Sequence, residues 1–193
     1  NQPGVLAVWS SLSVWLAEAL KADGEVDTAI TYGHSRYGKT ALIAAAVSPS
    51  IDAVIAHQSG TGGASLLRDE TGESIAQVLE NYPHWFTSNF ASFAYEKESL
   101  PVDSHFLLSL IAPRPLLLGN ARRDVWSDPA GAFNAARAAS PSWAQYGSQG
   151  LTAARLDDYR PQDDLAFWMR PGTHGVVEED WPAFLEFLDA HFK

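Results

Sequence analysis

The stretch that decides the fold is Gly33–Thr40 (GHSRYGKT), which stands between a β-prone run and a helix-forming run. The run at 27–32 is short and rich in β-forming residues, and the run at 39–47 continues as a helix pattern until Pro49 closes it. A serine on a tight turn from strand to helix is typical of a nucleophile elbow. The same residues also fit G-x-x-x-x-G-K-[ST], the pattern of a phosphate-binding loop. The stretch therefore predicts a strand–turn–helix unit with two possible chemistries.

Outward from this unit, apolar strand patterns alternate with helix patterns. We expect strands at 27–32, 53–57, 116–119 and 165–170, and helices at 5–20, 39–47, 104–111, 130–139 and 182–192. Asp103 is a candidate cap for the helix that follows it, and residues 64–100 are irregular and aromatic. The alternation predicts an α/β fold with a mostly parallel sheet and helices on both faces. In such sheets the chemistry lies at the carboxyl ends of the strands.

The residues that follow the later strands separate the two chemistries. A phosphate loop needs an aspartate at the end of a neighbouring strand to organise Mg²⁺, but these strands end in His57-Gln58 and Gly119-Asn120. A serine hydrolase needs an acid and then a histidine, and Asp124 and His174 follow the third and fourth strands in that order. Although the elbow pattern usually has glycine where Tyr37 stands, the hydrolase interpretation is favoured.

Composition excludes several other classes of protein. The chain of 193 residues has no cysteine, which excludes disulfides, thiolate zinc sites and a cysteine nucleophile. Its net charge of -10 argues against nucleic acid or an anionic membrane as partner. Charged residues or proline interrupt each apolar run that approaches the roughly 20 residues of a membrane span. No histidine pair has metal-ligand spacing with a third partner, so we predict no metal and interpret four histidines as structural: His57, His84, His105 and His191.

The chain resembles the glucuronoyl esterases of carbohydrate esterase family 15, whose signature Gly-Cys-Ser-Arg-x-Gly reads here from Gly33 to Gly38. Other motifs of the series extend the resemblance over residues 5–193: Ser59–Ala64, Tyr82–Phe86, Leu100–Asp103, Ile111–Pro115, Asp124–Pro129 and Arg170–His174. The resemblance implies an α/β-hydrolase fold and a serine esterase that needs no cofactor.

The resemblance also assigns roles to the site residues. Ser35 is expected as the nucleophile, His174 as the general base and then acid, and Arg36 as an oxyanion donor through its amide and guanidinium. The triad acid of fungal members would fall at Gln58, which is no carboxylate. The acid is therefore expected after the third strand, as in bacterial members, with Asp124 as the first candidate and Asp128 as the second.

The family's sugar site corresponds to Lys39, Glu73 and Trp126. The first two are expected to hydrogen-bond hydroxyls of a glucuronate ring, and Trp126 to contact the sugar. One departure from the signature is His34, which replaces the cysteine of many members.

By this resemblance the protein hydrolyses the ester between 4-O-methyl-glucuronoyl groups of glucuronoxylan and lignin alcohols, through a Ser-His-Asp triad and an acyl-enzyme. Two alternatives stay open: another carbohydrate esterase, such as an acetyl xylan esterase, and a carbohydrate-binding remnant without turnover. The resemblance implies a secreted or periplasmic protein.

The position of the nucleophile elbow in the chain indicates how much of the catalytic domain residues 1–193 contain. A full α/β-hydrolase sheet has about eight strands with the elbow after the fifth, whereas here the elbow follows the first strand pattern. Residues 1–193 are therefore expected to form a single, partial catalytic domain, the C-terminal half of a longer one. The missing N-terminal half is the expected partner of the strand at 27–32, which would otherwise be an open edge.

Overall fold

A parallel four-stranded sheet is the centre of the computed structural model, which describes residues 2–69 and 71–193. The strands are β1 (Ile30–His34), β2 (Ala53–His57), β3 (Leu116–Ala121) and β4 (Leu165–Arg170), in the spatial order β1-β2-β3-β4. All neighbouring pairs are parallel, and the first pair runs from Ile30 opposite Ala53 to His34 opposite His57. The carboxyl ends of all four strands therefore lie at one edge of the sheet, as predicted.

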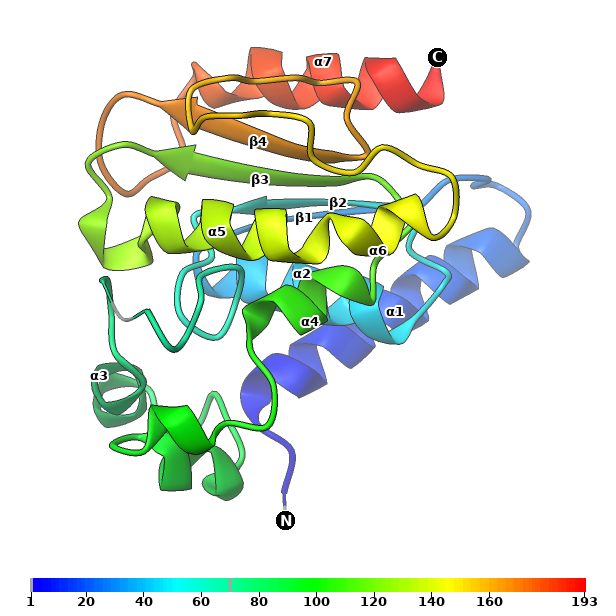
Figure 1. The fold of residues 1–193 in the computed structure, drawn as a ribbon. Coiled ribbons are helices and arrows are strands. Elements are labelled where there is room, and N and C mark those ends of the chain that lie inside the picture. Colours follow the sequence, from blue (N-terminus) through cyan, green and yellow to red (C-terminus); the bar gives the residue numbers. More distant parts are fainter. Residues whose placement is uncertain (1, 70) are drawn as a thin grey trace.

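Helices cover both faces of this sheet (Figure 1), so the predicted α/β class is confirmed. The helices are α1 (Val5–Ala22), α2 (Arg36–Val47), α3 (Ile75–Asn81), α4 (Ser104–Ser109), α5 (Pro129–Ala139), α6 (Pro141–Ala144) and α7 (Asp180–Phe192). One face packs on α7 through Phe184 and Phe187, which contact alternate strand residues such as Leu117. The other face packs on α2, α4 and α5, and Trp143 lies fully buried beneath it.

Several boundaries differ from the sequence expectation. The first strand is Ile30–His34 rather than 27–32, because its pairing with β2 begins opposite Ala53 and continues to His57. The helix after the elbow begins at Arg36, three residues early, since the turn at Ser35 leads straight into it. The segment 64–100, expected to be irregular, contains α3, which starts with a capping box between Ser74 and Gln77.

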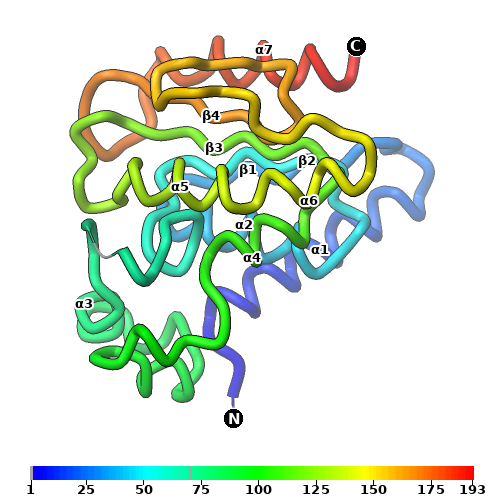
Figure 2. The backbone as a smooth tube through the Cα atoms, viewed as in Figure 1, coloured from blue at the N-terminus to red at the C-terminus, as the bar shows by residue number. Residues whose placement is uncertain are grey.

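Helix α1 packs against α2, and Figure 2 shows it below the sheet, leading from the N-terminus. Its inner face, with Leu6, Val14 and Ala17, is buried, while Trp15 and Leu16 on its outer face are 63% and 61% exposed. By length and composition alone α1 reaches the range of a membrane span, with 18 residues and a mean hydropathy of 1.3. Glu18 and Lys21 interrupt this run, as expected from the sequence, so α1 reaches that range with two charged residues within it. A core helix passes the same test.

Candidate active site

The turn at Ser35 has the backbone geometry of a nucleophile elbow. Ser35 has φ 57° and ψ −122°, a conformation that L-residues rarely adopt, and its amide donates a 2.8 Å hydrogen bond to the carbonyl of His57. A Cβ at Gly33 would lie 2.0 Å from the carbonyl oxygen of Tyr37, so only glycine fits below the turn. The Tyr37 side chain is itself exposed, which explains why no glycine is needed at that position.

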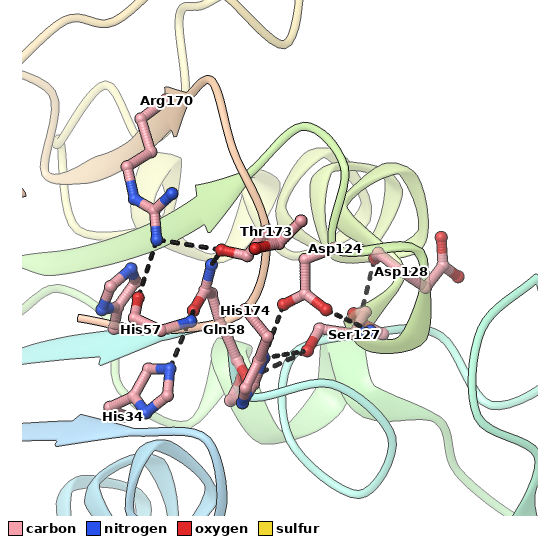
Figure 3. Close-up of polar contacts among 12 residues, drawn as sticks. His34, His57, Gln58, Asp124, Ser127, Asp128, Arg170, Thr173 and His174 are labelled. Atoms are coloured by element: carbon pink, nitrogen blue, oxygen red, sulfur yellow. Dashed lines mark hydrogen bonds and ion pairs between the residues drawn. The ribbon is translucent and has the colours of Figure 1, made fainter. Parts of the chain in front are cut away.

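An acid and a histidine from the loops that follow β3 and β4 meet at the carboxyl ends of these strands (Figure 3). Asp124 Oδ2 lies 2.7 Å from Nδ1 of His174, and Asp124 Oδ1 accepts a hydrogen bond from the amide of Ser127 at 3.3 Å. Burial of Asp124 opposes its charge, but the hydrogen bonds from His174 and Ser127 outweigh burial and hold its pKa below the usual value. The other candidate acid, Asp128, instead caps α5 by accepting from the amide of Gly131 at 2.9 Å.

A pocket of about 250 Å³ brings six of the seven predicted site residues together. Its predicted lining residues are Ser35, Arg36, Lys39, Glu73, Trp126 and His174. Asp124, the seventh, is buried behind the His174 ring. The candidate nucleophile, the candidate base and two cationic side chains therefore converge on one concave site.

The Arg36 guanidinium lies over two stacked aromatic rings at the wall of this pocket. Tyr82 and Trp85 stack with 3.8 Å between ring centroids and 3° between planes, and the guanidinium carbon of Arg36 lies 5.1 Å from the Trp85 centroid. Such cation–π contacts restrict a long side chain to one position. The charge of Arg36 is thus held beside the turn that carries Ser35.

Lys39 and Glu73 are two buried, oppositely charged residues that line the same pocket. The Lys39 ammonium, 4% exposed, donates to the carbonyl of Ser59, and burial lowers the pKa of Lys39 to about 8 despite the attraction of Glu73. Burial also raises the pKa of Glu73, although Lys39 and the hydrogen-bonding side chain of Trp126 oppose that change. Among the described residues Glu73 Oε1 finds no hydrogen-bond partner. A buried, unpaired oxygen in a pocket is suited to a donor from a ligand, such as a hydroxyl.

Comparison with known proteins shows to which family the chain belongs. A family model of fungal glucuronyl esterases matches residues 3–147. The chain belongs to the glucuronoyl esterase family. It is similar to a promiscuous CE15 esterase from a marine bacterial metagenome, with 35% identity, a TM-score of 0.93 and coverage of 98% of this chain. It is also similar to a glucuronoyl esterase from Solibacter usitatus, with 33% identity, a TM-score of 0.90 and coverage of 100% of this chain.

A curated fungal relative of this glucuronoyl esterase family member is the 4-O-methyl-glucuronoyl methylesterase of Phanerochaete carnosa, 35% identical over 122 residues and 60% of this chain. The chain spans 49% and 51% of the two bacterial structures and 30% of the fungal protein, so about half or less of the relatives it matches. The prediction of family and of a C-terminal portion is confirmed.

Three residues of the site in this family member were not predicted from the sequence. Ser127 Oγ lies 3.2 Å from His174 Nδ1 and donates to the carbonyl of Gln58. Gln58, noted in the sequence only for lacking a carboxylate, and Arg170 at the end of β4 both bind the loop that carries His174. For Gln58 and Arg170, the position directly after or at the end of a strand was the available signal.

Across residues 2–69 and 71–193 the structure has no group of three or more histidine, aspartate or glutamate side chains placed to hold a metal ion. The polar groups of the pocket include the strained serine Ser35, the acid-paired His174, the cations Arg36 and Lys39, and the carboxylate of Glu73. The arrangement can perform acyl transfer with the chain's own side chains.

Proposed function

We propose that the protein containing this chain is a serine esterase that cleaves glucuronoyl esters. The observation that carries the proposal is the strained Ser35 in one pocket with His174, whose Nδ1 bonds the buried Asp124 at 2.7 Å. An ester hydrolase needs this combination, because a serine hydroxyl attacks a carbonyl only when a base removes its proton. Family membership supports the same conclusion.

In the proposed reaction Ser35 Oγ bonds to the ester carbonyl carbon while its proton passes to Nε2 of His174. The resulting oxyanion is stabilised by the amide of Arg36 and by its guanidinium; such donors are worth about 3–4 kcal/mol in the transition state. The carbon–oxygen bond to the alcohol then breaks, and the alcohol leaves with the proton from His174. Water, deprotonated by His174, attacks the Ser35 ester and releases the glucuronic acid. Asp124 holds the imidazolium in each step.

The substrate class follows from the polar floor of the pocket. We assign the sugar hydroxyls of a 4-O-methyl-glucuronoyl group to Lys39 and Glu73, where one carboxylate oxygen lacks a partner among the described residues, and a sugar face to Trp126. The name of the Phanerochaete carnosa relative supports this acyl group. The alcohol is assigned to lignin, esterified to the glucuronoyl groups of glucuronoxylan. Because these polymers lie outside the cytoplasm, secretion or export to the periplasm is part of the proposal.

The test is hydrolysis of benzyl glucuronate ester by the whole protein as its gene encodes it. Activity that Ser35→Ala abolishes, with labelling of Ser35 by a fluorophosphonate, is the expected result. Faster hydrolysis of acetylated xylan would instead favour an acetyl esterase. Binding of glucuronoxylan without labelling or turnover would favour a non-catalytic protein and overturn the proposal.

The same proposal includes a partner for the open side of the sheet. Among the described strands β1 pairs with β2 alone, and beside it a groove of about 500 Å³ is lined by residues of α1 and β1, such as Leu16, Leu20 and Ile30. Exposed apolar side chains gathered along a groove are typical of a surface that another segment or partner covers. We assign it to the N-terminal half of the same catalytic domain, consistent with the half-length match to the bacterial structures.

A further inference from the structure

A buried amide at the end of β2 holds the chain on both sides of His174. Gln58 is 1% exposed, and its Nε2 donates to the carbonyl of Thr173 at 3.3 Å. Its Oε1 accepts two hydrogen bonds, from the amide of Gly175 at 2.9 Å and from Nε2 of His34 at 2.8 Å. Figure 3 shows Gln58 between His34 on β1 and the loop that carries His174. One side chain thus contacts both neighbours of the proposed base.

The orientation of this amide is fixed by its partners. If the oxygen and nitrogen were exchanged, the NH₂ group would face the amide N–H of Gly175, and the oxygen would face the carbonyl of Thr173. Both contacts would be repulsive, since donors would meet donors and acceptors would meet acceptors. The observed orientation also requires that His34 carries its proton on Nε2.

A second side chain, Arg170, also binds the loop that carries His174. Nη2 of Arg170 donates to the carbonyls of Thr173 at 3.0 Å and Gly175 at 2.7 Å, while its Nε donates to Asp180 at the start of α7 at 2.9 Å. The loop has Gly172 at φ 102° and Gly175 at φ 151°, so its own backbone restricts it little. The hydrogen bonds from Gln58 and Arg170 therefore help to fix its path, together with the bond from the Arg123 amide to the Gly172 carbonyl at 2.9 Å and the contact between Asp124 and His174.

The His174 ring also contacts the ring of His34. The rings of His34 and His174 lie 4.5 Å apart between centroids at an angle of 45°, and His34 is the residue that donates to Gln58. Movement of the Gln58 side chain would release the His34 ring as well as the loop. Gln58 borders the candidate pocket, but its amide is engaged at both ends by the protein, so it acts through its neighbours.

We propose that Gln58 is a positioning residue that keeps the His174 ring directed at Ser35, an inference that rests on the proposed esterase function. Without its amide, Asp124 and His174 would still be present, but the loop could turn Nε2 of His174 away from the serine. Binding of the sugar would change little, because the Gln58 side chain bonds His34, Thr173 and Gly175 and neither Lys39 nor Glu73. The loss of activity is therefore expected in the chemical step, as a lower kcat, and not in substrate binding.

The kinetic test is made in the whole protein with benzyl glucuronate ester. Gln58→Leu, which keeps volume and removes the amide, is expected to lower kcat about 10- to 100-fold with KM within about twofold. Gln58→Glu keeps the acceptor for Gly175 and His34 but lacks the donor to Thr173, so its loss should be smaller. A matched control for stability is Arg114→Met, since the Arg114 guanidinium bonds the carbonyls of Ala45, Ser48 and Ile51, remote from the pocket.

Nitrogen-15 NMR of the His174 ring supplies a readout that does not depend on turnover. In the natural sequence the neutral ring is expected as one tautomer with its proton on Nδ1 toward Asp124, and Gln58→Leu should mix the tautomers and speed exchange of the Gly175 amide. The proposal is overturned if Gln58→Leu keeps kcat within twofold, if its kcat falls no more than that of an equally destabilised Arg114→Met, or if the ring signals are unchanged. If no ester is hydrolysed even by the natural sequence, the proposed function fails, and the NMR comparison still decides whether Gln58 positions His174.

Discussion

Asp124 Oδ2 lies 2.7 Å from Nδ1 of His174, although 50 positions separate the two residues in the chain. The contact forms because each residue follows a strand of one parallel sheet, β3 for Asp124 and β4 for His174, and the carboxyl ends of these strands are neighbours. Asp128, four residues further on, caps α5 instead. This difference between two aspartates of one loop leads to the first prediction.

Asp124→Asn should reduce kcat on a glucuronate ester by about a thousandfold or more, because an amide in this place stabilises the wrong tautomer of His174 and no imidazolium. Asp128→Asn is the matched control. It makes the same chemical change in the same loop and keeps an oxygen for the Gly131 amide, so its kcat should stay within a few-fold. Initial rates at saturating ester check both variants. Equal losses from the two variants would contradict the assignment of the acid.

A second prediction concerns Lys39, whose pKa burial lowers to about 8. If the ammonium binds the sugar, kcat/KM should fall as the pH rises through about 8, because the cation is lost there. Lys39→Met should have a lower kcat/KM that no longer depends on pH in this range. A pH–rate profile from 6 to 9.5 measures the effect, and an unchanged alkaline limb in the variant would exclude Lys39 as its source.

Lys39→Met should lower kcat/KM, but it should not lower the free energy of unfolding. Between pH 8 and the usual lysine value the unfolded chain binds more protons than the folded chain, so burial of a charged Lys39 costs stability at pH 7 and less at higher pH. Removal of the charge should leave the free energy of unfolding at pH 7 equal to or above that of the natural sequence. Urea melts at pH 7 check this, and a clear loss of stability would show that the pair with Glu73 outweighs the cost of burial.

A third prediction concerns acid sensitivity. His57 is fully buried on β2, and burial lowers its pKa to about 4 despite the attraction of Asp180, 3.5 Å away. The folded chain keeps His57 neutral while the unfolded chain protonates it below about 6.5, so stability falls as the pH drops from there toward 4. Between pH 7 and 5 the loss from this group is about 2 kcal/mol.

His57→Leu should remove most of this acid-dependent loss, because Asp180 keeps its bonds to Arg170 and to the amide of Val177. Urea melts of both proteins at pH 7, 6 and 5 measure the difference in slope, whatever the absolute stability of the variant. Parallel slopes would mean that His57 is not the group that titrates.

A fourth prediction concerns the outer face of α1. In the whole protein the side chains of Trp15 and Leu16 should be protected from hydroxyl radicals at least several-fold relative to the isolated chain 1–193, since the proposed N-terminal half covers them. Tyr95, 92% exposed, is the internal control and should label equally in both. Mass spectrometry of the oxidised peptides reads the result. Equal labelling of Trp15 in the two samples would exclude that covering.

The sequence alone was enough to predict the buried strands, the turn at Ser35 and the family. The strands at 53–57 and 165–170 were predicted to the residue, because continuous apolar runs bounded by polar residues specify buried parallel strands locally. The turn at Gly33–Gly38 was equally readable, since a glycine that must lie against Tyr37 and a serine before a helix are local features. Strand order led to Ser35, Asp124 and His174, whereas Lys39, Glu73 and Trp126 were expected from the resemblance to the family, which followed from the series of motifs.

The tertiary structure decided what depends on distance through space. Asp124 and Asp128 follow the same strand, and only the turn Val125–Ser127 directs one toward His174 and the other toward α5. Gln58 contacts Gly175 across 117 positions, which no local pattern encodes. The pKa values of Lys39 and His57 depend on burial by segments far apart in the chain. Periodicity specifies each element by itself, whereas packing specifies which side chains meet, and the chemistry of the site belongs to packing.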